Sequence, residues 1–262
     1  MDILDRILAA KRVELEAEKR AVPMRRAIEL ASAAHAPHPF LPALRRSGSV
    51  NVIAEVKRAS PAKGSIAASA DPVAIARAYA DAGAAAISVL TDARFFLGAP
   101  GHLEEVRRAV GVPLLRKDFL FEEYQIYRSR ALGADAVLLI ARVLEPRLLT
   151  TLIGISRSLD MEALVEVHSE DDAARAVDCG ASLIGVNNRD LGTMTTSLEI
   201  SLRLAERLPA GAVKVSESGI ESRADIDRLR AAGYDAFLVG ERLMRDADPG
   251  AALRSLVNGA AA

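Results

Sequence analysis

The sequence contains no tryptophan, and Cys179 is its only cysteine. A single cysteine excludes an internal disulfide and any zinc site built from several cysteines. Aromatic residues make up only 4% of the chain. Such a chain offers few rings on which the bases of a single-stranded nucleic acid could stack. We therefore expect no nucleic-acid partner.

An excess of one charge and long apolar runs are also missing. The 34 basic and 35 acidic residues leave a formal net charge of -1. No apolar run approaches the roughly 20 residues of a membrane span. The first residues carry acid early and lack the apolar core of a signal peptide. We therefore expect a soluble, cytoplasmic protein that does not bind membranes.

From about residue 50 the sequence alternates between short β-rich runs and longer helical patterns, eight times. The runs centre near residues 53, 88, 114, 138, 165, 185, 214 and 238. Asp71 and Asp248 each precede a proline, as an N-cap precedes a helix, and Ser169 and Ser222 begin capping-box patterns. Strands that alternate with helices pair in parallel through right-handed crossovers.

Four glycines recur at intervals of about 50 residues, each between a helical pattern and the next run: Gly83, Gly133, Gly180 and Gly233. This repeat favours a closed barrel over an open sheet, which would more often carry a glycine-rich fingerprint after its first strand. We predict a (β/α)8 TIM barrel at residues 49–262 in a single domain, 1–262. Residues 1–48 form its N-terminal helical extension, in which Ile3, Leu4, Ile7 and Leu8 share one helix face.

The predicted strands end in charged or amide residues. These are Glu55 and Lys57, Lys117, Glu166, Asn187 and Arg189, and Glu217. Burying unpaired charge is costly, so the repeated placement predicts one polar mouth at the carboxyl ends of the strands. Residues two apart share a face, so Glu55 and Lys57 point the same way. Either they belong to an active site, or they form only an ion pair that plugs the barrel.

Lysines and glutamates gathered in one mouth shift one another's pKa values and can exchange protons. The four histidines show no metal-site spacing, and His168 has no identifiable partner. We therefore expect acid–base chemistry with no metal and no cofactor.

Gly219 and Gly240 follow the last two predicted strands, where barrels often bind phosphate through backbone N–H groups. The loop at residues 58–70 is long for its position and could be a lid or a solvated surface loop. Phe119 shares a face with Lys117 and could be an aromatic wall of the site or part of the core.

Seven segments in order resemble the indole-3-glycerol phosphate synthase family. They read IAEVKRASP (53–61), SVLTD (88–92), RKDF (116–119), EVH (166–168), IGVNNRDL (184–191), SESGI (216–220) and FLVGE (237–241). The resemblance covers essentially the whole chain. It implies a cofactor-free carboxy-lyase of tryptophan biosynthesis. The substrate would be 1-(2-carboxyphenylamino)-1-deoxyribulose 5-phosphate, and the products indole-3-glycerol phosphate, carbon dioxide and water.

The resemblance also implies roles for the site residues. Lys117 would be the general acid of ring closure, and Lys57 would hold the aryl carboxylate. Glu166 and Glu55 would stabilise the cationic intermediate and take part in dehydration. The others would position the substrate (Asn187, Arg189, Glu217, Ser218) or bind its phosphate (Ser60, Gly219, Gly240). The N-terminal helices would cover part of the mouth, and the side chain of Glu241 should point away from it.

Two other functions stay open. One is another phosphate-binding barrel enzyme, such as phosphoribosylanthranilate isomerase or a Schiff-base lyase. The other is a non-catalytic barrel that binds a phosphorylated ligand or a protein. We expect a monomer, with transient contact to other tryptophan-pathway enzymes left open. The sequence assigns no role to Asp92 or Arg142, and it does not say which lysine acts in which step.

Overall fold

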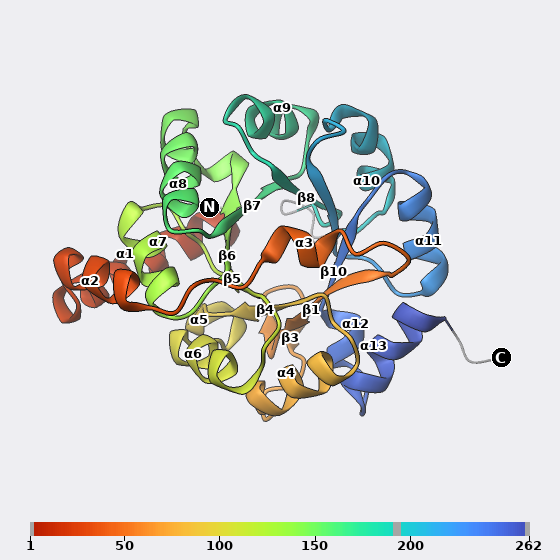
Figure 1. Cartoon of the computed structure of the whole chain (residues 1–262), viewed down its shortest axis with the longest axis horizontal. Coiled ribbons are helices and arrows are strands. Elements are labelled where there is room, and N and C mark those ends of the chain that lie inside the picture. Colours follow the sequence, from red (N-terminus) through yellow and green to blue (C-terminus); the bar gives the residue numbers. More distant parts are fainter. Residues whose placement is uncertain (1–2, 191–194, 260–262) are drawn as a thin grey trace.

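The computed structural model describes residues 3–190 and 195–259, and its centre is a closed barrel of eight parallel strands (Figure 1). The strands are β1 (Asn51–Val56), β4 (Ala86–Leu90), β5 (Leu114–Lys117), β6 (Ala136–Ile140), β7 (Glu162–Val167), β8 (Leu183–Asn187), β9 (Val213–Glu217) and β10 (Ala236–Val239). Each strand pairs with the next in this order, and β10 returns to pair with β1. All eight predicted runs lie in these strands, so the predicted (β/α)8 TIM barrel is confirmed.

Helices surround the strands (Figure 1). The longer ones are α4 (Pro72–Asp81), α6 (Pro100–Ala109), α7 (Glu123–Ala131), α8 (Pro146–Ser158), α9 (Glu170–Asp178), α11 (Arg223–Ala231) and α13 (Pro249–Asn258). Shorter pieces are α5 (Ala93–Phe96), α10 (Glu199–Leu204), α12 (Glu241–Met244) and the 3₁₀ turns η1 (Ala141–Val143) and η2 (Ala205–Arg207). A small ribbon, β2 (Ala59–Ser60) and β3 (Gly64–Ser65), lies in the loop after β1.

The predicted helix caps are present. The side chains of Asp71 and Asp248 accept hydrogen bonds from backbone N–H groups in the first turns of α4 and α13. Ser169 and Ser222 do the same for α9 and α11. The predicted capping box is complete at Ser222, where Asp225 accepts from the N–H of Ser222, whereas Asp172 in α9 accepts from the N–H of His168 instead. The four repeated glycines all have positive φ values, between 80° and 94°, directly after a helix. Glycine adopts this conformation without the strain that a Cβ atom would cause.

Alternation along the strands separates two apolar layers. Val52, Ala54 and Val56 of β1 belong to the layer between strands and helices, whereas Ile53 belongs to the barrel interior. The interior layer also includes Phe40 and Leu44 of α3 (Phe40–Leu44), which packs against the start of β1. Because α3 packs at that end, the polar strand ends lie at the opposite end of the barrel.

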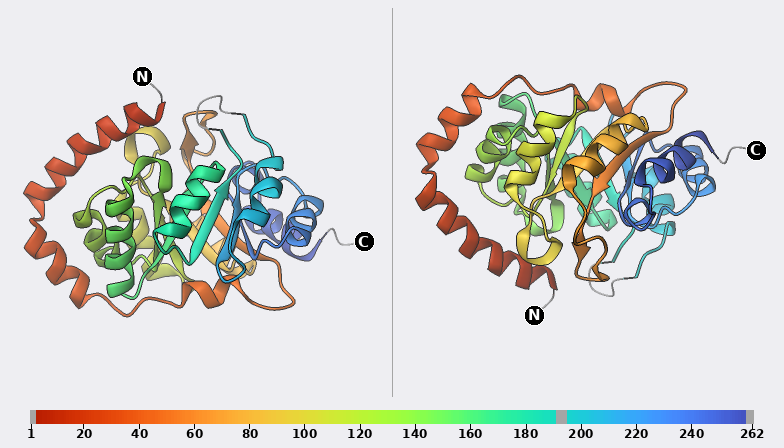
Figure 2. Two further views of the ribbon diagram at one scale, coloured as in Figure 1. Left: turned by 90° about the horizontal axis from the view of Figure 1, so that it is seen from above. Right: turned by 90° about the horizontal axis from the view of Figure 1, so that it is seen from below.

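The N-terminal extension wraps around the outside of the barrel as α1 (Ile3–Ala21) and α2 (Met24–Ala33) (Figure 2). Helix α2 packs against α7. Lys11 of α1 is buried, and its Nζ lies 2.8 Å from Asp92 Oδ2 and 3.0 Å from Asp118 Oδ1. Asp92 also caps α5 through the N–H of Phe95. Asp92 therefore fastens the extension to the barrel, a role that the sequence did not reveal.

No helix within residues 3–190 or 195–259 is both long enough and apolar enough to cross a membrane.

Candidate active site

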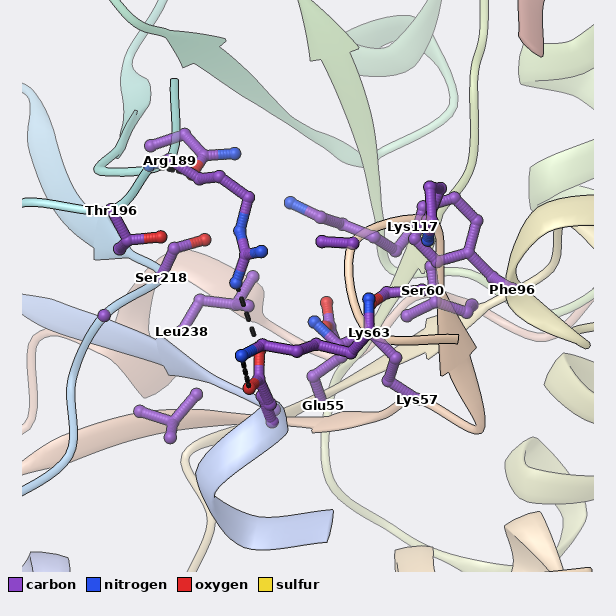
Figure 3. A pocket seen from close by; sticks show the side chains of 18 of the residues that line it. Glu55, Lys57, Ser60, Lys63, Phe96, Lys117, Arg189, Thr196, Ser218 and Leu238 are labelled. Carbon is purple, nitrogen blue, oxygen red and sulfur yellow. Dashed lines mark hydrogen bonds and ion pairs between the residues drawn. The ribbon is translucent and has the colours of Figure 1, made fainter. Parts of the chain in front are cut away.

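A pocket of about 530 Å³ lies at the carboxyl ends of the strands (Figure 3). All but one of the predicted site residues line it: Glu55, Lys57, Ser60, Lys117, Phe119, Glu166, Asn187, Arg189, Ser218, Gly219 and Gly240. The exception, Glu217, is buried and binds Lys117. The structure therefore brings together residues that are up to 185 positions apart, from Glu55 to Gly240.

Lys117 ends β5, and its ammonium lies among carboxylates from other strands. Its Nζ is 3.0 Å from Glu166 Oε2 and also donates a short hydrogen bond to Glu217 Oε2. Burial opposes the charge, but Glu217, Glu166 and Glu55 outweigh this effect and raise the pKa of Lys117 above its ordinary value. Lys117 therefore stays protonated and can deliver a proton.

Glu166 in β7 and Glu217 in β9 share this one ammonium. Burial raises the pKa of Glu217 to about 7; the charge of Lys117 reduces the rise and the nearby Glu166 adds to it. At Glu166 burial also opposes the charge, but Lys117 and His168 outweigh it, so its pKa is lowered. The pair thus contains one carboxylate that stays ionised and one that takes up a proton near neutral pH.

Gly185 in β8 makes room for the Glu217 carboxyl group. A Cβ atom on Gly185 would lie 2.1 Å from Glu217 Oε1, much closer than any real contact. That oxygen is buried and has no hydrogen-bond partner among the described residues. An unpartnered oxygen favours the neutral carboxyl form, which agrees with the raised pKa of Glu217.

Glu55 and Lys57 share a face, as the alternation predicts. Lys57 Nζ lies 2.9 Å from Glu55 Oε1, and Ser88 donates to the other oxygen of Glu55 over 3.3 Å. Burial opposes the charge on Glu55, but Lys57 and Lys117 outweigh it and lower its pKa. A Cβ atom on Gly240 would lie 2.7 Å from Glu55 Oε1. Gly240 therefore has a steric reason to be glycine, besides its predicted place in the phosphate site.

Asn188 holds the turn that carries Ser218 and Gly219. Both turn residues have positive φ values, 66° and 80°. The buried side chain of Asn188 donates to Ser218 O over 3.1 Å and to Ser216 Oγ over 3.0 Å. It also accepts from the N–H of Ser201. This support fixes the place of the two predicted ligand-binding residues.

Phe119 meets both interpretations that the sequence left open. It lines the pocket and packs against the interior layer of the barrel. Its ring centre lies 6.1 Å from that of Phe96, which also lines the pocket. Together the two rings form an aromatic wall.

Glu241 departs from expectation. Its side chain was predicted to point away from the mouth, but it lines the pocket. Its Oε2 lies 3.1 Å from Arg189 Nη2, and its Oε1 lies 3.1 Å from Arg245 Nη2 and 3.9 Å from Lys63 Nζ. The prediction was wrong because it considered only repulsion by phosphate and not the cations that reach this carboxylate from other segments.

A model of the indole-3-glycerol phosphate synthase family matches residues 4–256. The chain belongs to this family. Similar relatives bear the same name: the enzyme of Roseiflexus sp. (strain RS-1) is 48% identical over 98% of both chains. The enzyme of Carboxydothermus hydrogenoformans is 47% identical over 97% of this chain and 99% of its own. The resemblance seen in the sequence is therefore confirmed.

Among solved structures, 3-hexulose-6-phosphate synthase from Salmonella typhimurium matches this family member with a TM-score of 0.63 at 12% identity. The match covers 79% of this chain and 96% of that structure. A match at such low identity supports the barrel fold alone.

Several pocket residues of this family member were missed in the sequence. Ile3, Leu4 and Ile7 of α1 line the pocket, although their pattern indicated only an amphipathic helix. The family resemblance had implied that the N-terminal helices cover part of the mouth, without naming these residues. Four apolar residues from the inner faces of β4, β6 and β10 also line it: Leu90, Leu138, Ile140 and Leu238. Side-chain alternation could have indicated these four. Within the described part of the chain, no three His, Cys, Asp or Glu side chains are arranged to hold a metal ion.

Proposed function

We propose that the chain converts 1-(2-carboxyphenylamino)-1-deoxyribulose 5-phosphate into indole-3-glycerol phosphate, carbon dioxide and water, with Lys117 as the general acid. The reaction is the one that names the family. The observation that carries the assignment is the ammonium of Lys117, held at the pocket among the carboxylates of Glu166 and Glu217. A charged proton donor fixed in a largely buried position is what ring closure onto a ketone requires.

In the first step the aryl carbon attacks the ketone carbon, and a carbon–carbon bond forms. Lys117 donates its proton to the ketone oxygen, which becomes a hydroxyl group. The ring and its nitrogen then carry a positive charge, which the nearby carboxylates of Glu166 and Glu55 stabilise. Glu217, with its pKa raised to about 7, can return a proton to Lys117.

In the second step the bond to the carboxylate breaks, carbon dioxide leaves, and its electron pair restores the neutral ring system. Lys57 lies beside Glu55 at the mouth of β1 and holds the carboxylate until this step. Dehydration completes the indole: the hydroxyl group leaves as water with a proton from an acid, and a base removes a proton from the neighbouring carbon. Glu166, whose lowered pKa keeps it ionised, is the base that we assign.

The remaining residues orient the substrate. Asn187 accepts a hydrogen bond from the N–H of Arg189, so the two are held together at the end of β8. We assign the phosphate to Ser60, Gly219 and Gly240, with Arg189 and Ser218 beside it. The aromatic ring of the substrate would rest against Phe119.

The test is conversion of the substrate by the purified chain, followed through the fluorescence of the indole product. Because the chain has no tryptophan, its own fluorescence does not obscure this signal. We expect fluorescence to rise with time. No rise would favour a non-catalytic barrel. A covalent adduct after borohydride treatment with a keto-phosphate would favour a Schiff-base lyase instead.

We further propose that the chain acts as a monomer in the cytoplasm and as one domain, with the barrel at residues 49–262. Gel filtration with light scattering tests the oligomeric state, and a mass of twice 27.9 kDa would contradict it.

A further inference from the structure

Three cations from three different segments meet at the carboxylate of Glu241. Lys63 comes from the loop after β1, Arg189 follows β8, and Arg245 directly follows α12. Figure 3 shows Arg189 and Lys63 reaching toward one place, with dashed lines to this carboxylate. The side chains of Glu241 and Arg189 are only 15% and 19% exposed, so they lie inside the mouth, whereas Lys63 and Arg245 are more than half exposed and reach Glu241 from its rim.

We propose that Glu241 is an internal counter-anion that competes with the phosphate of the substrate for these cations. The inference rests on the proposed phosphate site, because Glu241 directly follows Gly240. A phosphate dianion bound there would attract the same guanidinium and ammonium groups. The Glu241 carboxylate keeps them gathered, and it also repels the incoming anion.

This arrangement makes anion binding selective. A ligand must offer more than one negative charge, or additional hydrogen bonds, to draw the cations away from a carboxylate that is already in contact with them. Lys63 adds a link to the loop at residues 58–70, since its contact with Glu241 joins that loop to the far side of the mouth. If the phosphate binds Lys63 in place of Glu241, the loop is then held to the far side of the mouth through the phosphate.

The experiment measures the binding of inorganic phosphate by calorimetry to the wild-type chain and to Glu241→Gln. Glu241→Gln removes one negative charge beside the proposed phosphate site, so phosphate binding should tighten about fivefold. The KM for the substrate should fall to a similar extent. The value of kcat should not rise, because substrate and product both carry the phosphate. Glu241→Ala, which also removes the carboxylate, carries the same expectation if Glu241→Gln does not fold.

Glu221→Gln is the matched control. Glu221 also lines the pocket and binds Arg245 over 3.0 Å, but within the described residues it forms no ion pair with Arg189 or Lys63. We expect a change in phosphate affinity of less than about twofold. Equal tightening in both variants would reduce the effect to net charge and overturn the proposal. Unchanged or weaker phosphate binding in Glu241→Gln would also overturn it.

Phosphate binding is read without turnover, so the two proposals can fail separately. Tighter phosphate binding in Glu241→Gln with no indole formation by the wild-type chain would contradict the proposed activity and support the role of Glu241 as a counter-anion. Indole formation by the wild-type chain with unaltered phosphate binding in Glu241→Gln would support the proposed activity and contradict the role of Glu241.

Discussion

The two ends of the pocket use charge in different ways. At the inner end, Glu217 is 1% exposed, Glu166 4% and Lys117 13%. Burial raises the pKa of Glu217, and neighbouring charges outweigh burial to raise the pKa of Lys117 and lower that of Glu166. At the outer end, Lys63 and Arg245 are more than half exposed, and their ion pairs involve Glu241. Buried charges are fixed and tuned for proton transfer, whereas exposed charges are exchangeable and suited to binding. Mutations at the two ends should therefore change different kinetic constants.

The largest difference should come from two lysine-to-methionine changes. Lys117→Met removes the proposed proton donor, so kcat should fall by at least about 100-fold while the fold stays intact. Lys63→Met removes a binding charge, so KM should rise by a few-fold with little change in kcat. Steady-state kinetics with circular dichroism checks both. Near-normal turnover in Lys117→Met would remove the assignment of the acid.

Breaking a buried ion pair on the N-terminal helices should lower the free energy of unfolding more than breaking an exposed one. Lys11→Met leaves Asp92 and Asp118 without their lysine, and breaking a buried pair in this way should lower the free energy of unfolding by about 3 kcal/mol. Arg25→Met removes an ion pair with Glu29 on the surface of α2 and should change the free energy of unfolding by less than about 0.5 kcal/mol. Urea denaturation measures both; equal losses would contradict the distinction.

The pH dependence of stability should reveal the proton shared at the inner end. The pKa of Glu217 is raised from 4.5 to about 7 by folding, so between these values the folded chain holds more protons than the unfolded chain. Its contribution is therefore present below pH 4.5 and is lost as the pH rises to 7, on the order of 3 kcal/mol in total. Glu217→Gln should flatten this slope.

The control for that slope is Glu221→Gln at the outer end, where the side chain is 56% exposed. Urea denaturation at several pH values should give this variant the slope of the wild-type chain. If Glu217→Gln keeps that slope as well, the group that binds the proton lies elsewhere.

Two glycines should respond in opposite directions, with the smallest effects. Gly185→Ala would force Glu217 to move, so it should lower the free energy of unfolding by about 1–3 kcal/mol and reduce kcat. Gly154 lies within α8 with open space around it, and Gly154→Ala should stabilise the chain by about 0.5–1 kcal/mol. A Gly185→Ala variant with wild-type stability and kcat would show that Glu217 needs no such space.

The sequence predicted the features that local patterns determine. Strand alternation placed Glu55 and Lys57 on one face, and cap residues such as Asp71 marked the helix starts, because both depend on a few neighbouring positions. The features it missed depend on distant contacts. Lys11 is separated from Asp92 by 81 positions in the chain, and nothing near either residue indicates their ion pair.

The error at Glu241 has the same origin. The neighbouring Gly240 indicated a phosphate site, but the orientation of the Glu241 side chain depends on Arg189 and Lys63. The proposed role of each site residue also depended on the family resemblance, since the strand-end pattern alone indicates acid–base chemistry and no particular substrate.

The pairing of β10 with β1 has a consequence for synthesis of the protein. Glu55 and Gly240 are neighbours only because the last strand closes the ring against the first. A ribosome-bound chain that ends before β10 already holds Lys57, Lys117, Glu166 and Glu217, yet it lacks one wall of the pocket. Closure of the barrel and assembly of the pocket are therefore one event. The onset of enzymatic activity would report that β10 has docked between β9 and β1.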